Sequence, residues 1–139
     1  MDTSKMEFAT KALILREGKY LALHKTGAKH DFYELPGGRM EFGETAEETL
    51  IRELKEETNF LVEPIKLLDT WNFISKNHQI TGVIYLCEII EGEFKLSDEH
   101  DKYQWLKFND VSINVMYDAF KERMVNWDMK EIEKGMRII

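Results

Sequence analysis

The sequence has little of what marks secreted, membrane or disordered proteins. Its 139 residues include a single cysteine, Cys87, which excludes an internal disulfide. The apolar runs are far shorter than the roughly 20 residues that cross a bilayer. With only 2 prolines and 8 glycines, the composition also excludes disordered, collagen-like and low-complexity chains. We therefore expect a cytoplasmic protein without membrane contact, folded as one domain over residues 1–139.

Basic residues are outnumbered, with 19 Lys and Arg against 26 Asp and Glu, so the net charge is −7. An acidic surface repels nucleic-acid backbones, and no long nucleic acid is expected as a partner. The charge is also concentrated. Residues 41–57 hold seven acids and two bases, and thus carry −5 of the −7.

The remaining pattern predicts an α+β fold. Runs rich in strand-forming residues predict five strands, over residues 8–16, 19–24, 61–73, 79–90 and 103–108. One helix is predicted to begin at Thr45, in a capping box, and to end at Asn59. A second helix is predicted over residues 115–134, with Gly135 as its stop. This order suggests a sheet with helices packed against it.

Three glutamates mark the first predicted helix. Glu53, Glu56 and Glu57 follow the spacing i, i+3, i+4, which places them within about 100° of one helical face. A charged surface helix is one interpretation, because acidic clusters on helices are common. The other is a site for Mg²⁺ or Mn²⁺, which prefer oxygen ligands and bridge to phosphates. Glu44 at the helix entry and the main-chain carbonyl of Gly38 would add further oxygen atoms.

Residues 38–60 resemble the box of the Nudix hydrolase family, whose pattern is G-x5-E-x7-R-E-U-x-E-E-x-G-U, where U is a bulky apolar residue. Every specified position matches except one, where Asn59 replaces the last glycine. Leu35-Pro36-Gly37-Gly38 and Glu99-His100-Asp101 resemble further segments of the family. The resemblance implies an α+β fold, a Nudix-type α/β/α sandwich with a mixed β-sheet between helices.

The resemblance also implies a reaction, which is hydrolysis of a nucleoside diphosphate linked to a group X with Mg²⁺ or Mn²⁺ as cofactor. The implied metal ligands are Gly38, Glu53, Glu56 and Glu57. The implied catalytic residue that orients or deprotonates water is one of Glu53, Glu44 and Glu99. Arg52 and Gly43 would be structural, with Arg52 paired to Glu44 to hold the geometry of the ligands.

Substrate contacts are less closely defined by the sequence. Lys25, after the second predicted strand, is a candidate phosphate contact, although a solvated lysine is the simpler interpretation. Phe73 is a candidate stacking partner for a base, although aromatic residues on strands usually belong to the core. The four histidines show no metal-ligand spacing.

Features that mark several Nudix subfamilies are mostly missing, so the chain resembles the MutT-like nucleoside triphosphate pyrophosphohydrolases. Hydrolysis of ADP-ribose or another nucleotide sugar is an alternative. A domain that only senses a nucleotide is another, although such a domain would be expected to lack box glutamates, and none is missing here. The expected partner is a small-molecule nucleotide, and the expected state is a monomer or homodimer.

Asn59 is the one departure from the box pattern. A glycine at this position ends the helix, and Asn adopts the same left-handed conformation at modest cost. Asn59→Gly is therefore expected to be neutral or stabilising.

Overall fold

The computed structural model describes residues 3–136. Within this range the elements are β1 (Lys5–Arg16), β2 (Lys19–Lys25), β3 (Gly37–Arg39), α1 (Ala46–Thr58), β4 (Leu61–Ser75), β5 (His78–Glu91), β6 (His100–Lys107), α2 (Asp110–Ile113), α3 (Asp118–Met124) and α4 (Met129–Met136). None of these helices is long and apolar enough to cross a membrane.

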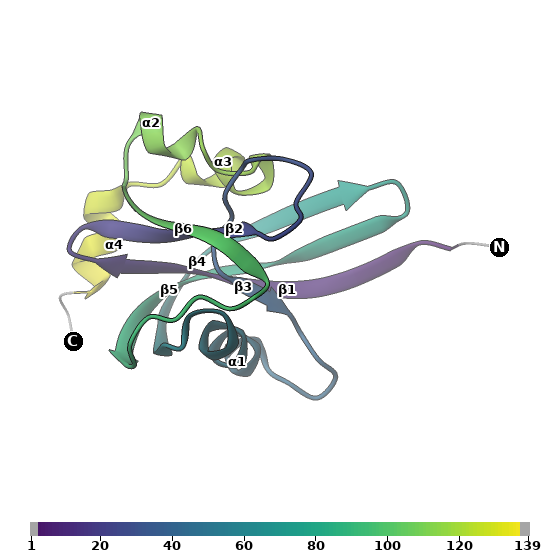
Figure 1. The fold of residues 1–139 in the computed structure, drawn as a ribbon, viewed down its shortest axis with the longest axis horizontal. Helices are drawn as coiled ribbons and strands as arrows, with labels where there is room; N and C mark the ends of the chain where they lie inside the picture. The colour runs from purple at the N-terminus through teal and green to yellow at the C-terminus, as the bar shows by residue number, and fades with distance from the viewer. Residues whose placement is uncertain (1–2, 137–139) are drawn as a thin grey trace.

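The strands form one mixed sheet in the order β4-β5-β1-β2-β6, with β3 paired to β1 beside this path. β1 and β5 run parallel, and the other paired strands run antiparallel. Helix α1 packs on one face of the sheet, while α3 and α4 pack on the other (Figure 1). This arrangement confirms the expected α+β fold, with a mixed sheet between helices.

The central strand β1 supplies both cores because its successive side chains point to opposite faces. Ala9 and Leu13 belong to the cluster beneath α3 and α4. Ala12 packs instead with Leu54 beneath α1. Lys11 has the same parity as Ala9 and Leu13, so a charged side chain enters the face that α3 covers.

The predicted strands are present, with shifted ends. β1 and β2 form the expected hairpin around Glu17 and Gly18, whose φ angles are 52° and 77°. The two long strands pair with each other in antiparallel fashion as β4 and β5. The strand predicted at residue 103 begins earlier, at His100. β3 was not predicted, because Pro36-Gly37-Gly38 indicates a break rather than a strand.

The prediction of a single C-terminal helix over residues 115–134 is wrong. This range contains α3 and most of α4, with a break between them, and the short helix α2 precedes it. Asp128 begins α4, because its Oδ1 accepts a backbone N–H of the first turn at 3.0 Å. The indole N–H of Trp127 donates to Asp69 Oδ2 on β4 at 2.9 Å, a tertiary contact that periodicity does not predict. The stop predicted at Gly135 is also wrong, since this residue lies inside α4.

Helix α1 begins and ends as predicted. The backbone N–H of Glu48 donates to Thr45 Oγ1 at 3.1 Å, and that of Thr45 donates to Glu48 Oε1 at 2.9 Å, which completes the capping box. Asn59 ends the helix in the left-handed region, with φ 65°. Its side-chain amide also donates to the carbonyl oxygen of Glu93 at 2.9 Å, a contact that the sequence pattern does not predict.

Candidate active site

The three glutamates on α1 differ in exposure. The side chain of Glu57 is 7% exposed and that of Glu53 is 16% exposed, whereas Glu56 is 59% exposed. Glu57 points beneath the chain that leads into β3, where the backbone N–H of Gly37 donates to its Oε1 at 2.8 Å. Glu53 and Glu57 line a cavity of about 410 Å³ together with Glu99, while Glu56 lies outside it.

Glycines bring the backbone of β3 close to these carboxylates. A Cβ at Gly38 would overlap the carboxylate of Glu53, so no larger residue fits there without moving it. A Cβ at Gly37 would overlap the backbone of Thr10 on β1. Gly43, predicted to be structural, has φ 93° in the turn before the helix, a conformation that favours glycine. The main chain at Gly38 therefore lies against the carboxylate of Glu53.

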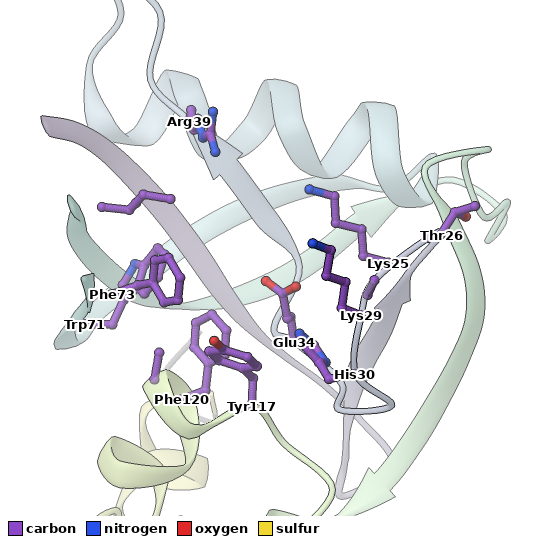
Figure 2. A pocket seen from close by; sticks show the side chains of 14 residues that line it. Lys25, Thr26, Lys29, His30, Glu34, Arg39, Trp71, Phe73, Tyr117 and Phe120 are labelled. Atoms are coloured by element: carbon purple, nitrogen blue, oxygen red, sulfur yellow. The ribbon is translucent and has the colours of Figure 1, made fainter. Parts of the chain in front are cut away.

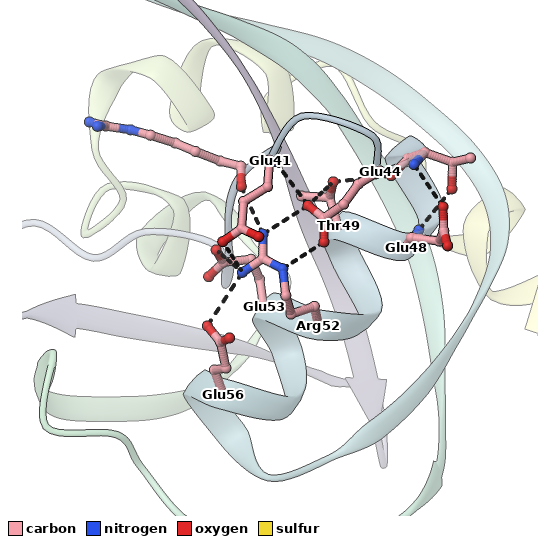
Figure 3. A network of polar contacts seen from close by, with 9 residues as sticks. Glu41, Glu44, Glu48, Thr49, Arg52, Glu53 and Glu56 are labelled. Carbon is pink, nitrogen blue, oxygen red and sulfur yellow. Dashed lines mark hydrogen bonds and ion pairs between the residues drawn. The ribbon is translucent and has the colours of Figure 1, made fainter.

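Arg52 is the centre of a network of carboxylates (Figure 3). Its Nε donates to Glu44 Oε2 at 2.7 Å and its Nη2 donates to Glu44 Oε1 at 3.0 Å, so the predicted contact is present. Its Nη1 donates to Glu53 Oε1 at 2.9 Å and to Glu56 Oε2 at 3.5 Å. Hydrogen bonds from Arg52 lower the pKa of Glu44 to about 2, so Glu44 is ionised at neutral pH.

The predicted metal ligands are neighbours, but they do not yet form a closed site. Among residues 3–136, no three His, Cys, Asp or Glu side chains converge closely enough to hold a metal ion. Two of the predicted ligands, Glu53 and Glu56, bind Arg52, and Glu57 binds the backbone. One guanidinium therefore holds two of the predicted ligands.

The electrostatics of the cavity suit a hard cation. Burial raises the pKa of Glu57 to about 8, although Lys11 and the N–H of Gly37 act in the opposite direction. Burial also raises the pKa of Glu53, and the charge of Glu99 adds to the rise. Crowded carboxylates with raised pKa values gain free energy from a nearby divalent cation. The donor set of carboxylate and main-chain oxygens thus fits Mg²⁺ or Mn²⁺.

A second cavity of about 370 Å³ adjoins the first. The residues that line both cavities are Lys25, Glu34, Arg39, Trp71 and Ile80. Figure 2 shows Lys25 and Lys29 on the side of this cavity opposite Trp71 and Phe73. The two predicted substrate contacts, Lys25 and Phe73, therefore face one cleft. One end of the cleft offers carboxylates, and the other offers aromatic faces and ammonium groups.

Lys11 and Glu34 also belong to this cleft, although no sequence motif includes them. The side chain of Lys11 is 11% exposed, and its Nζ lies 3.6 Å from Glu34 Oε1. Nζ is also 5.7 Å from the ring centroid of Trp71 and 5.5 Å from that of Phe120. The available signal was a lysine in the middle of an otherwise apolar strand, where a charge is unusual.

His100 enters the first cavity beside Glu99, at the start of β6. Its Nε2 lies 3.8 Å from Glu57 Oε2, and its Nδ1 lies 3.3 Å from Ser97 Oγ. Burial lowers the pKa of His100, which keeps the ring neutral at neutral pH. Glu99 is exposed, as its place on the loop before β6 allows.

His24 secures the loop that forms a wall of the second cavity. Its Nδ1 lies 2.6 Å from Asp101 Oδ1, and its Nε2 lies 3.0 Å from the carbonyl oxygen of His30. Both partners are acceptors, so the protonated imidazole, in which both ring nitrogens donate, satisfies both contacts. The hydrogen bond to Asp101 accordingly raises the pKa of His24. The ring therefore ties β2 and the following loop to β6.

Two curated proteins that are named as hydrolases of nucleotides are similar to this chain in sequence. The ADP-ribose pyrophosphatase of Methanocaldococcus jannaschii is 27% identical over 106 residues, which cover 74% of this chain and 63% of that protein. The 8-oxo-dGTP diphosphatase of Escherichia coli is 37% identical over 60 residues, which cover 43% of this chain and 46% of that protein. The chain thus spans less than two thirds of either relative.

Solved structures show the same fold. The MutT protein from Methanosarcina mazei Go1 superposes with a TM-score of 0.81 at 23% identity, over 93% of this chain and 97% of that one. A family model, that of the NUDIX domain, matches residues 7–128. Because this match covers most of the sequence and includes α1 with its carboxylates, the chain belongs to the Nudix family.

Proposed function

We propose that the protein is a Mg²⁺-dependent hydrolase that cleaves the pyrophosphate linkage of nucleoside triphosphates, releasing pyrophosphate and a nucleoside monophosphate. One observation carries this proposal. The cavity lined by Glu53, Glu57 and Glu99 adjoins a second cavity lined by aromatic and basic side chains. The first cavity suits a polyphosphate held through a cation, and the second is large enough for one nucleoside. Relatives named as a pyrophosphatase and a diphosphatase support the same class of reaction.

Four groups are assigned to the metal in this proposal. Glu53 and Glu57 line the cavity, Gly38 brings the main chain beside Glu53, and Glu56 follows on the same face of α1. Mg²⁺, or Mn²⁺ in its place, offsets charge on the phosphoryl oxygens and acidifies the attacking water when bound there. The buried position of Glu57 and its hydrogen bond from Gly37 orient its carboxylate before any ligand arrives.

The contacts of Glu44 favour a positioning role over proton transfer. Its carboxylate accepts hydrogen bonds from Arg52, from Thr49 Oγ1 and from the backbone N–H of Glu41, and it does not line the cavity. A carboxylate with a pKa of about 2 is also a weak base. We therefore assign Glu44 to holding Arg52, and the proton of the attacking water to Glu53 or Glu99.

The proposed reaction is a single displacement at phosphorus. The water oxygen forms a bond to phosphorus as its proton passes to Glu53 or Glu99. The bond from that phosphorus to the bridging oxygen breaks, and pyrophosphate leaves with the electron pair. Lys25 and Lys29 lie at the cleft, where positive charge attracts the phosphates of a small nucleotide.

A hydrolysis screen with Mg²⁺ or Mn²⁺ tests this function. It covers NTPs, dNTPs including oxidised guanine, ADP-ribose, dinucleoside polyphosphates and nucleotide sugars, with products separated by chromatography. The wild type should turn over triphosphates fastest, and Glu57→Gln should abolish turnover. Glu63→Gln, at an exposed position on β4, makes the same chemical change away from the cleft and serves as the control.

Three results would contradict the proposal. Inactivity of the wild type on every compound would favour a domain that only senses nucleotides. Full activity in Glu57→Gln would refute the metal assignment. Faster turnover of ADP-ribose than of any triphosphate would replace the substrate class with that named for the M. jannaschii relative.

A further inference from the structure

Lys11 and Glu34 face each other in the cleft with hydrogen-bonding capacity left unused. Their Nζ and Oε1 atoms are 3.6 Å apart, and no residue among 3–136 accepts a hydrogen bond from the ammonium or donates one to the carboxylate. The side chains are only 11% and 29% exposed. Partial burial of two charges costs desolvation free energy that one loose ion pair offsets incompletely. A ligand that completes their hydrogen bonds would therefore bind well.

The pair lies at the junction of the two cavities. Glu34 lines both, and Lys11 lines the first. The rings of Trp71 and Phe120, which lie within 6 Å of Lys11 Nζ at 5.7 and 5.5 Å, line the second. Figure 2 shows the carboxylate of Glu34 directed into the space between Phe73 and the two lysines. A flat ring bound among these aromatic side chains would present its polar edge to Lys11 and Glu34.

The backbone holds Glu34 in place before a ligand binds. Its N–H and carbonyl oxygen exchange hydrogen bonds of 2.8 and 2.9 Å with Leu23 on β2. The N–H of the preceding Tyr33 donates to the carbonyl oxygen of Val115 at 2.8 Å. Lys11 is fixed in turn by its place at the centre of the sheet. A preorganised pair pays less entropy on binding, which favours recognition of a specific ligand edge.

Guanine has the edge that matches this pair. Its N1–H and 2-amino N–H point the same way, so one carboxylate accepts both, while the adjacent O6 accepts from an ammonium. Adenine, cytosine and uracil each place a single kind of N–H donor beside an acceptor, which leaves one carboxylate oxygen of Glu34 unpaired. Hypoxanthine has O6 and N1–H but lacks the 2-amino group.

The geometry points to Lys11 and Glu34 as the residues that read the base, with Glu34 accepting from N1–H and the 2-amino group of guanine and Lys11 donating to O6. The protein is then selective for guanine nucleotides. This inference rests on the proposed function only in placing a nucleotide in the cleft.

Equilibrium binding of nucleoside 5′-monophosphates tests the pair without hydrolysis, because these compounds contain no pyrophosphate linkage. Calorimetry without divalent metal would compare GMP, IMP, AMP, CMP and UMP. The wild type should bind GMP about tenfold or more tightly than AMP, CMP or UMP, with IMP in between. Lys11→Met, which keeps the apolar stem over Trp71 and Phe120, should abolish the preference for GMP.

Glu34→Gln should also abolish the preference, and it decides the test if Lys11→Met lowers the melting temperature. Lys66→Met, at an exposed position on β4, removes the same charge outside the cleft and should bind the five monophosphates with the wild-type order of affinities. Equally weaker binding of all five monophosphates by both cleft variants would overturn the inference, because loss of a contact to phosphate or ribose would give that result. A wild-type preference for AMP, CMP or UMP would overturn it as well.

The proposed function and the base assignment can be refuted independently of each other. A preference for GMP that depends on Lys11 and Glu34, in a protein that hydrolyses no triphosphate, would refute the proposed function and support the base assignment. Hydrolysis of all triphosphates with equal kcat/KM, together with equal binding of the monophosphates, would support the function and overturn the base assignment.

Discussion

Arg52 binds Glu44 through two hydrogen bonds of 2.7 and 3.0 Å, and the same guanidinium reaches Glu53 at 2.9 Å. One end of this network is anchored by Glu44, which also accepts from Thr49. The other end orients a carboxylate that lines the cavity. Arg52 therefore connects the entry of α1 to the candidate metal site.

Arg52→Lys should weaken metal binding and turnover roughly 10- to 100-fold, because lysine cannot hold Glu44 and Glu53 with separate, fixed donors. Mn²⁺ binding followed by electron paramagnetic resonance measures the first effect, and kcat the second. Glu44→Gln keeps the shape of the partner and should act in the same direction. Wild-type Mn²⁺ affinity in Arg52→Lys would show that the network does not position the ligands.

In metal-free protein, the contribution of Glu57 to stability should fall as the pH rises from about 4.5 to about 8, the interval between the ordinary pKa of Glu57 and its raised value. In that interval the folded state keeps a proton that the unfolded state has released, so the free energy of unfolding falls with pH. Melting temperatures in a chelator across this range measure the slope. Glu57→Gln should flatten the slope, whereas Glu63→Gln should leave it unchanged.

Saturating Mg²⁺ or Mn²⁺ should raise the melting temperature near neutral pH, since a ligand that binds only the folded state stabilises it. The rise should be absent in Glu57→Gln, because that variant lacks the buried carboxylate of the proposed site. An equal rise in both proteins would place the stabilising metal elsewhere.

The ion pair of His24 and Asp101 should contribute most to folding stability at mildly acidic pH. The raised pKa of His24 means that its contribution is complete below about 6.5 and is lost as the pH rises through the folded value. The pKa of Asp101 is lowered by the same hydrogen bond, so its contribution is present above about 3.8 and is lost as the pH falls through the folded value. An NMR titration should find the pKa of His24 above 6.5 in the wild type and lower in Asp101→Asn. An unchanged value in that variant would contradict the assignment.

The hydrogen bond from Asn59 to Glu93 changes what is expected of substitutions at the end of α1. Asn59→Ala should cost about 1–2 kcal/mol of unfolding free energy, because it loses the hydrogen bond to Glu93 and places a Cβ in the left-handed region without a compensating polar group. Asn59→Gly relieves the backbone strain but loses the same hydrogen bond, so it should lower the free energy of unfolding by less than Asn59→Ala does. Urea unfolding compares the variants. A loss in Asn59→Gly as large as in Asn59→Ala would show that the side chain outweighs the backbone conformation.

Local patterns predicted α1 well and the C-terminal region poorly. Thr45, Glu48 and Asn59 act within one or two helical turns, so their roles follow from neighbouring residues. The periodicity over 115–134 was real, because Phe120 and Met124 are buried on one face. It could not show that the helix breaks where Trp127 binds Asp69, since β4 is distant in the chain.

The family, the first helix and the face that carries Glu53, Glu56 and Glu57 follow from the amino-acid sequence alone, because capping, helical period and box spacing act over short range. The burial of Glu57, the exposure of Glu56 and the contact between Lys11 and Glu34 depend on the tertiary structure. Those facts depend on the order of strands in the sheet, which brings β1, the segment before β3 and helix α1 around one cleft. Burial and charge pairing arise between segments far apart in the chain, and local sequence patterns do not contain them.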